Sequence, residues 1–153
     1  MKRVLLKSVF DAFEYVMAHY CPYGLEEMLE TDDTYAVISV QDSYTGGGFG
    51  FTFNETRYCR EALTLYVDDI TAPAPGAVLF SEEHARQVIS FIARNRSADT
   101  LLVHCYAGQS RSRAVAAFAV KMLGADNAQY FSTGVPNAHI YTTLMHVYEK
   151  EYR

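Results

Sequence analysis

The stretch LLVHCYAGQSRSRA, residues 101–114, decides how this chain folds. Residues 100–103 form a short apolar run typical of a buried strand, and residues 112–123 form an alanine-rich helical pattern that ends at Gly124. Between them lies a short loop that contains Gly108. A loop that joins a strand to a helix in this way directs backbone N–H groups and the helix N-terminus at one point. The stretch therefore predicts a phosphate-binding cradle.

Two reactive side chains flank that loop, Cys105 and Arg111, with five residues between them. The positive field of the cradle should lower the pKa of Cys105 and leave it as a thiolate, the form that attacks phosphorus. The planar guanidinium of Arg111 can hold two phosphate oxygens, which a lysine could not reproduce. The alternative is a buried strand-end cysteine beside an arginine that forms a salt bridge at the helix start.

The nine residues HCYAGQSRS, 104–112, resemble the signature H-C-x-x-G-x-x-R-S/T of the protein tyrosine phosphatase superfamily. The short chain is similar to the small dual-specificity-like bacterial or phage members, and the resemblance covers residues 60–125. It implies that Ser112 donates a hydrogen bond to the Cys105 thiolate and helps to break down a phosphocysteine intermediate. It also implies that His104 orders the loop from behind. The loop positions expected to bind substrate are Tyr106, Ala107, Gly108, Gln109 and Ser110.

The same resemblance implies a general acid on a loop some thirty or more residues before the cysteine. Asp68 and Asp69 follow the apolar run 63–67, and Asp69 lies 36 residues upstream of Cys105 (105 − 69). We expect Asp69 to be the acid because the Asp-Ile pair that it forms with Ile70 resembles that of related short phosphatases, but Asp68 remains open. Taken alone, the two aspartates are equally well explained as a turn or a capping pair.

The rest of the chain alternates expected helices with expected strands. Helices are predicted after Ser8, Ser81 and Asn137, each placed as an N-cap, and a short segment is expected near residues 127–131. Residues 35–40 and 63–67 read as strands, and the glycine-rich stretch 43–57 as a surface loop or a loop that faces substrate. This alternation predicts an α/β fold of one domain, residues 1–153, with a central, mostly parallel twisted sheet flanked by helices on both sides.

The composition narrows the environment and the partners. The formal net charge is −5, which disfavours nucleic acid and anionic membranes as partners. The N-terminal apolar run Val4–Leu6 is too short for a secretory leader, and no stretch is long enough for a membrane span. Three cysteines at irregular spacing argue against a disulfide framework and for a reducing, cytoplasmic compartment. We expect a monomer without metal or organic cofactor.

The expected substrate is a phosphotyrosine protein, with phosphoserine and phosphothreonine left open. The loop positions Tyr106, Ala107, Gln109 and Ser110 carry no charge, whereas lipid phosphatases of the superfamily commonly place lysines there. Phosphoinositides and RNA 5′-phosphates are therefore alternatives of lower rank. A different class of function is a non-catalytic module that binds phosphoproteins, although the simultaneous presence of Cys105, Arg111 and Asp69 argues against it.

Overall fold

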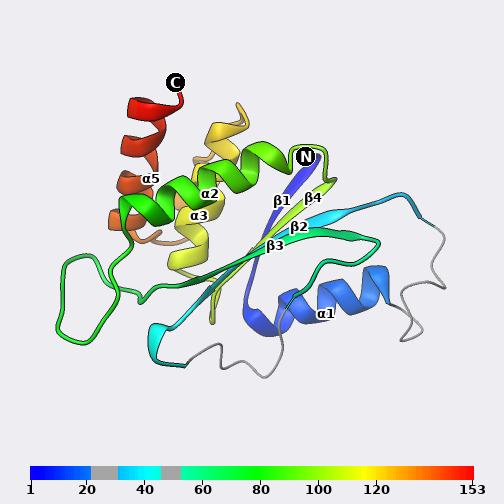
Figure 1. Cartoon of the computed structure of the whole chain (residues 1–153), viewed down its shortest axis with the longest axis horizontal. Coiled ribbons are helices and arrows are strands. Elements are labelled where there is room, and N and C mark those ends of the chain that lie inside the picture. Colours follow the sequence, from blue (N-terminus) through cyan, green and yellow to red (C-terminus); the bar gives the residue numbers. More distant parts are fainter. Residues whose placement is uncertain (22–30, 46–52) are drawn as a thin grey trace.

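The computed structural model describes residues 1–21, 31–45 and 53–153. In these residues four strands form one sheet in the order β1-β4-β2-β3, and every neighbouring pair is parallel. The expected class, an α/β fold around a parallel sheet, is confirmed (Figure 1). The strands are β1 Arg3–Lys7, β2 Tyr35–Gln41, β3 Cys59–Tyr66 and β4 Thr100–His104.

Strand β1 is the strand of the described residues that the sequence analysis does not predict. Its apolar run is only three residues long, and in the sequence analysis it is weighed only as a secretory leader, for which it is too short. In the structure β1 lies at the sheet edge beside β4, with Leu5 opposite Leu102. An edge strand needs to bury less surface than a central one, so three apolar residues between charged ends are sufficient.

Five helices accompany the sheet in the described residues, and the predicted N-caps are confirmed. Ser8 accepts a hydrogen bond from the Asp11 amide at the start of α1, Ser81 accepts one from His84 at the start of α2, and Asn137 caps α5. Such caps satisfy amides that have no partner inside the helix. The helices are α1 Val9–Tyr20, α2 Glu82–Arg94, α3 Arg111–Met122, α4 Gln129–Ser132 and α5 Ala138–Glu151.

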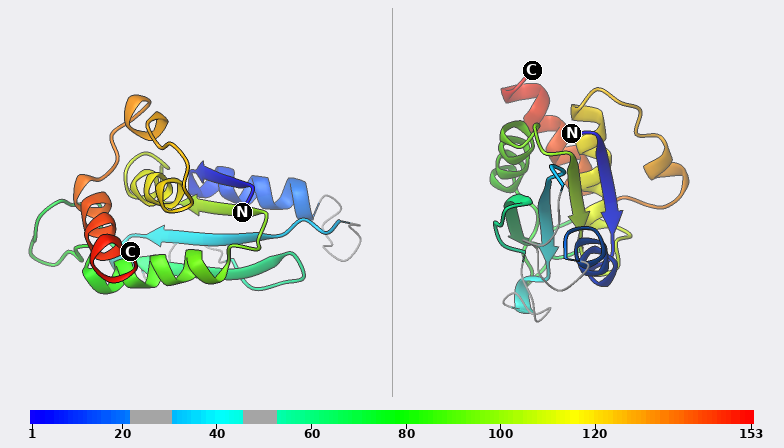
Figure 2. Two further views of the ribbon diagram at one scale, coloured as in Figure 1. Left: turned by 90° about the horizontal axis from the view of Figure 1, so that it is seen from above. Right: turned by 90° about the vertical axis from the view of Figure 1, so that its right-hand side faces the viewer.

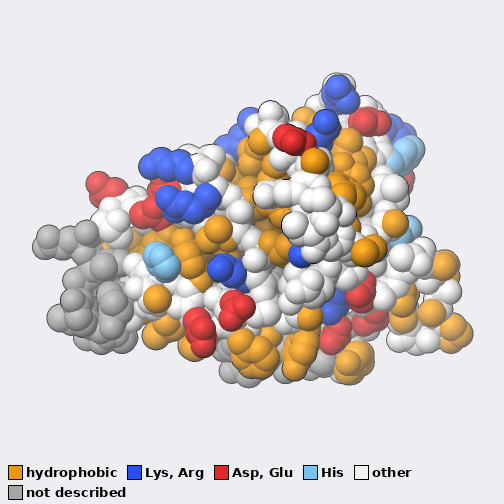
Figure 3. Space-filling view, turned by 180° about the vertical axis from the view of Figure 1, so that it is seen from behind, with side chains coloured by type: hydrophobic (Ala, Val, Ile, Leu, Met, Phe, Trp, Pro, Cys, Tyr) orange, Lys and Arg blue, Asp and Glu red, His pale blue; other side chains and the backbone are white. Residues whose placement is uncertain are grey.

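The helices cover both faces of the sheet, as expected. Helix α1 packs on one face with Val37 and Leu102, whereas α2, α3 and α5 pack on the other with Ile38 and Val103 (Figures 1 and 2). Alternate residues of each strand therefore enter different cores, which explains the unbroken apolar runs of β2 and β4. The face of the molecule in Figure 3 mixes acidic and basic side chains with hydrophobic ones. No helix of the described residues is long and apolar enough to span a bilayer.

The parallel arrangement brings the carboxyl ends of the strands to one edge of the sheet. Asp42 follows β2, Asp68 and Asp69 lie just beyond β3, and Cys105 follows β4. This edge is where open parallel sheets place their ligands. A short 3-10 turn at Ser43–Thr45 leaves the same edge, and the expected glycine-rich loop 43–57 lies partly outside the described residues, because residues 46–52 are not described.

Candidate active site

The candidate nucleophile, Cys105, is buried and surrounded by hydrogen-bond donors. Its Sγ lies 3.0 Å from Ser112 Oγ and 3.3 Å from the backbone nitrogen of Gly108. Burial acts to raise the pKa of the thiol, but the hydrogen bonds from Ser112 and Gly108 and the charge of Arg111 outweigh it, so the pKa lies below its ordinary value. The loop therefore favours the thiolate that nucleophilic attack requires.

The loop around Cys105 rests on the corner between β1 and α1. Gly108 has a φ of 72°, and a Cβ at this position would lie 2.7 Å from the carbonyl carbon of Lys7. The Val9 amide donates to the Tyr106 carbonyl at 3.0 Å. A side chain larger than hydrogen cannot fit at Gly108, so the edge strand that the sequence reading missed is what supports the loop from below.

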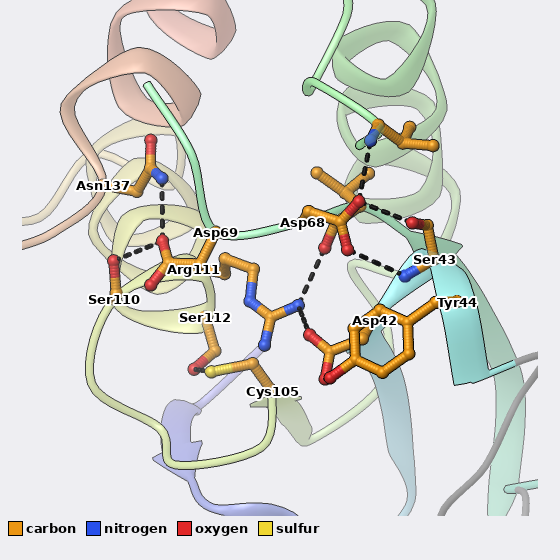
Figure 4. Close-up of polar contacts among 12 residues, drawn as sticks. Asp42, Ser43, Tyr44, Asp68, Asp69, Cys105, Ser110, Arg111, Ser112 and Asn137 are labelled. Atoms are coloured by element: carbon orange, nitrogen blue, oxygen red, sulfur yellow. Dashed lines mark hydrogen bonds and ion pairs between the residues drawn. The ribbon is translucent and has the colours of Figure 1, made fainter. Parts of the chain in front are cut away.

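Arg111 is held from one side by an aspartate that sequence reasoning did not single out. Its Nη1 lies 2.7 Å from Asp42 Oδ1 and donates to the Val67 carbonyl at 2.8 Å. Figure 4 shows the guanidinium lying between Asp42 and Cys105. Both contacts use Nη1, so the fork formed by Nε and Nη2 is the pair suited to two phosphate oxygens. The Arg111 side chain is only 7% exposed, so this orientation is firmly set.

Asp69 binds Ser110 of the phosphate-binding loop and Asn137 at the start of α5, and both donate to the same carboxylate oxygen. Ser110 Oγ donates to Oδ1 at 2.8 Å, and Asn137 Nδ2 donates to the same atom at 2.9 Å. Figure 4 shows these two bonds to Asp69, and Asn137 also donates to the Ile70 carbonyl at 3.1 Å. Because both side-chain donors bind Oδ1, Oδ2 accepts neither of these two hydrogen bonds.

Asp68 points elsewhere and serves a different purpose. It accepts hydrogen bonds from the backbone and hydroxyl of Ser43, and from the Val78 amide at 2.7 Å. The Ser43 hydroxyl is the main cause that lowers the pKa of Asp68, followed by the two amides. A carboxylate that accepts three hydrogen bonds makes a poor proton donor, so Asp69 stays the predicted acid.

The remaining predicted site residues lie in or behind the loop. Burial lowers the pKa of His104 despite its contact with the Cys105 carbonyl, whose oxygen is 3.1 Å from Nδ1. A neutral imidazole in that position cannot readily carry protons to solvent, and the loop-ordering role expected of His104 stays a prediction. At the loop surface Tyr106, Ala107 and Gln109 are exposed, Ser110 is half-buried and Gly108 is buried.

Sequence reasoning missed Asp42 and Asn137. Asp42 follows a buried strand, so its place at the carboxyl edge was a signal that could have identified it. Asn137 was read only as a helix cap, and in the structure it caps α5 and also binds Asp69. In the described residues no group of His, Cys, Asp and Glu side chains could hold a metal ion.

No protein-family model and no curated protein matches the chain. Solved structures do match along nearly all of it. The human tyrosine phosphatase-like serine/threonine/tyrosine-interacting protein is 17% identical with a TM-score of 0.62, and covers 99% of both chains. PTPMT1 in complex with PI(5)P is 16% identical with a TM-score of 0.61, over 98% of this chain and 92% of the other. Tk-PTP in its active form is 17% identical with a TM-score of 0.58, over 98% and 93%. The chain therefore has the fold of the tyrosine and dual-specificity phosphatases.

Proposed function

We propose that the chain is a cysteine-dependent phosphatase that hydrolyses phosphomonoesters, with phosphotyrosine proteins as its substrates. The observation that carries this proposal is the thiol of Cys105, which lies among the donors of Ser112 and Gly108 at the mouth of the loop. The lowered pKa of that thiol and the phosphatase fold of the chain both support it. Neither feature is needed if Cys105 is only a packing residue.

In the first step the Cys105 thiolate attacks phosphorus. The fork of Arg111 and the loop amides bind the equatorial oxygens, over which negative charge is spread in the transition state. The bond between phosphorus and the leaving oxygen breaks while Asp69 Oδ2 gives that oxygen a proton. The products are a phosphocysteine and a neutral phenol or alcohol.

In the second step a water molecule attacks the phosphocysteine. The Asp69 carboxylate, now deprotonated, takes a proton from that water, and the sulfur–phosphorus bond breaks. Ser112 Oγ lies 3.0 Å from the sulfur and donates a hydrogen bond to the departing thiolate. Inorganic phosphate is released, and all groups return to their starting protonation states.

The uncharged rim of the loop supports a protein substrate. A highly charged inositol headgroup would find no cationic side chain at Tyr106, Ala107 or Gln109 at the surface of the loop. Two comparisons define the arms of the test. PTPMT1 was solved with PI(5)P, so a phosphoinositide is one alternative substrate, and the phosphatase-like interacting protein makes binding without turnover the other alternative.

The test measures hydrolysis of para-nitrophenyl phosphate, phosphotyrosine and phosphoserine peptides and PI(5)P, with reductant and a metal chelator present. The variants are Cys105→Ser, Arg111→Lys and the matched pair Asp69→Asn and Asp68→Asn. We expect no turnover by Cys105→Ser. Arg111→Lys and Asp69→Asn should each lose about 100-fold or more in turnover rate, because each change removes a group that acts in the transition state. Asp68→Asn should lose less than about tenfold, since general acid catalysis is retained.

Each outcome assigns one function. Chelator-resistant turnover that needs Cys105 supports the phosphatase, and the best substrate sets its class. A stronger effect of Asp68→Asn than of Asp69→Asn would transfer the acid role to Asp68. A folded wild-type protein that binds phosphotyrosine peptides without hydrolysing any substrate would overturn the proposal in favour of the binding module.

A further inference from the structure

A pocket with a volume of about 480 Å³ lies directly beside the candidate active site. Its walls are residues 69–72 of the acid loop, Ser110 of the phosphate-binding loop, and residues 135–138 at the start of α5. Asp69 and Ser110 thus belong to the active site and to this pocket at once. The volume exceeds what one amino-acid side chain occupies, so the pocket is large enough for part of a bound substrate.

The walls of the pocket are mostly apolar, and their one ionisable group is Asp69. Val135 stands at the rim with 83% of its surface exposed. The nearby cation Arg113 does not line the pocket, because its guanidinium is buried behind Gly134 and donates to Thr133 Oγ1 at 2.9 Å. An anionic side chain that entered the pocket would therefore find no cationic side chain to pair with, which is unfavourable.

We propose that this pocket is a specificity subsite that takes an apolar side chain of the substrate protein, at a position next to the phosphorylated residue. The inference rests on the proposed function and extends it to the sequence around the target. A glutamate or a second phosphorylated residue at the same position is disfavoured, because no cationic side chain lines the pocket.

The occupant follows from the position of the pocket relative to the phosphate cradle. Ser110 lies in the loop that would hold the phosphate, and its hydroxyl reaches the wall of the pocket at Asp69. Consecutive Cα atoms in a peptide are about 3.8 Å apart, so a neighbouring residue of the same substrate chain is the group that can reach this hollow. A basic side chain would pair with Asp69 and oppose its proton transfer, so an apolar side chain is the occupant compatible with turnover.

Binding of peptides to the full-length Cys105→Ser protein tests the subsite without requiring turnover. The probes are fluorescent phosphotyrosine peptides that differ only beside the phosphotyrosine, with leucine, glutamate or phosphothreonine on either side. We expect leucine on one side to bind about five- to tenfold more tightly than glutamate there, because half-burying its side chain removes apolar surface from water. Phosphothreonine should bind most weakly of the three.

Three further variants in the same background decide whether Val135 borders the subsite. Val135→Lys supplies the missing cation, so it should lower the affinity ratio of the leucine peptide to the glutamate peptide by about threefold or more, or reverse it. Val135→Glu should raise that ratio. Ala125→Lys is the matched control, because Ala125 is exposed beyond the opposite end of α3 and gains the same charge. Its preference should equal that of the parent.

The outcomes separate the subsite from the catalytic proposal. Equal affinities for the three peptides on both sides, a preference for glutamate, or an absence of peptide binding would each overturn the subsite. A leucine preference that Val135→Lys leaves unchanged would also overturn it. If the wild-type protein hydrolyses para-nitrophenyl phosphate but Cys105→Ser fails these binding tests, the proposed function stands and the subsite falls. If Cys105→Ser binds the peptides selectively but the wild-type protein hydrolyses no substrate, the subsite stands and the proposed function falls.

Discussion

The replacement of Asp42 by asparagine tests how the phosphate clamp is held. In the structure Asp42 Oδ1 lies 2.7 Å from Arg111 Nη1, and the Val67 carbonyl accepts a second bond from the same nitrogen. We interpret Asp42 as the group that orients the guanidinium, so that its other two nitrogens face phosphate. The opposite interpretation is that Asp42 competes with phosphate for Arg111. Asparagine keeps the shape of the side chain, removes its charge and replaces one acceptor oxygen with an NH2 donor.

The magnitude follows from the burial of the pair. Removing one partner of a fully buried ion pair typically costs about 3–5 kcal/mol. The Asp42 side chain is 22% exposed, and Arg111 keeps its bond to the Val67 carbonyl, so the loss should be smaller. We expect about 1.4–2 kcal/mol of lost transition-state binding, which lowers kcat/KM by about 10- to 30-fold.

The assay compares kcat/KM for para-nitrophenyl phosphate with the inhibition constant for orthovanadate. Asp42→Asn should lower the first and weaken the second. Asp32→Asn is the matched control, because Asp32 is exposed and loses the same charge, and its two constants should equal those of the wild type. Tighter binding of orthovanadate to Asp42→Asn would refute the orienting role, since it would mean that the carboxylate had been competing for the guanidinium.

Three further predictions concern the loop and its acid. Asn137→Ala should lower kcat for phenyl phosphate by about tenfold, and kcat for para-nitrophenyl phosphate by less. Phenyl phosphate has the poorer leaving group and therefore depends more on an oriented acid. Equal losses of kcat for the two substrates would argue that Asn137 has a purely structural role. The lowered pKa of Cys105 predicts that the thiolate persists as the pH falls. Alkylation of Cys105 by iodoacetate, measured by mass spectrometry, should therefore stay fast well below about pH 8.5. In Ser112→Ala the alkylation rate should begin to decline at a higher pH than in the wild type. Gly108→Ala should lower the free energy of unfolding, measured by chemical denaturation, by about 3 kcal/mol or more, because its Cβ would clash with backbone atoms. Gly124 has a φ of 86° and open space around it, so Gly124→Ala should lower the same free energy by only about 1–2 kcal/mol. Similar losses in the two variants would contradict the close approach at the loop.

The sequence was informative wherever a feature depends on neighbouring residues. The N-caps Ser8, Ser81 and Asn137 were predicted correctly, because a cap and the amide that it binds lie within three residues of each other. The central strands β2 and β4 were identified for a similar reason, since burial on both faces leaves a continuous apolar run. Strand β1 was missed because an edge strand with three apolar residues has no distinctive pattern.

The candidate site likewise contains residues that neighbouring sequence predicts and residues that only distant contacts bring in. Cys105, Arg111 and Ser112 lie within eight consecutive residues, 105–112, so their chemistry could be predicted as a unit from spacing and from the family resemblance. Asp42 and Asn137 could not, because each reaches the site from a different strand or helix. Their contacts depend on β2 lying between β4 and β3, and on α5 beginning beside the acid loop.

The sequence by itself thus determined the class of fold and predicted the reactive groups and the cradle expected to hold them, because all three predictions depend on local spacing and hydrophobic periodicity. Only the tertiary structure decided which aspartate faces the loop. Asp68 and Asp69 are chemically identical neighbours, and the difference between them is set by distant partners, Ser43 for the one and Ser110 with Asn137 for the other. Those partners are brought together by strand order and helix packing, which no local pattern in the chain encodes.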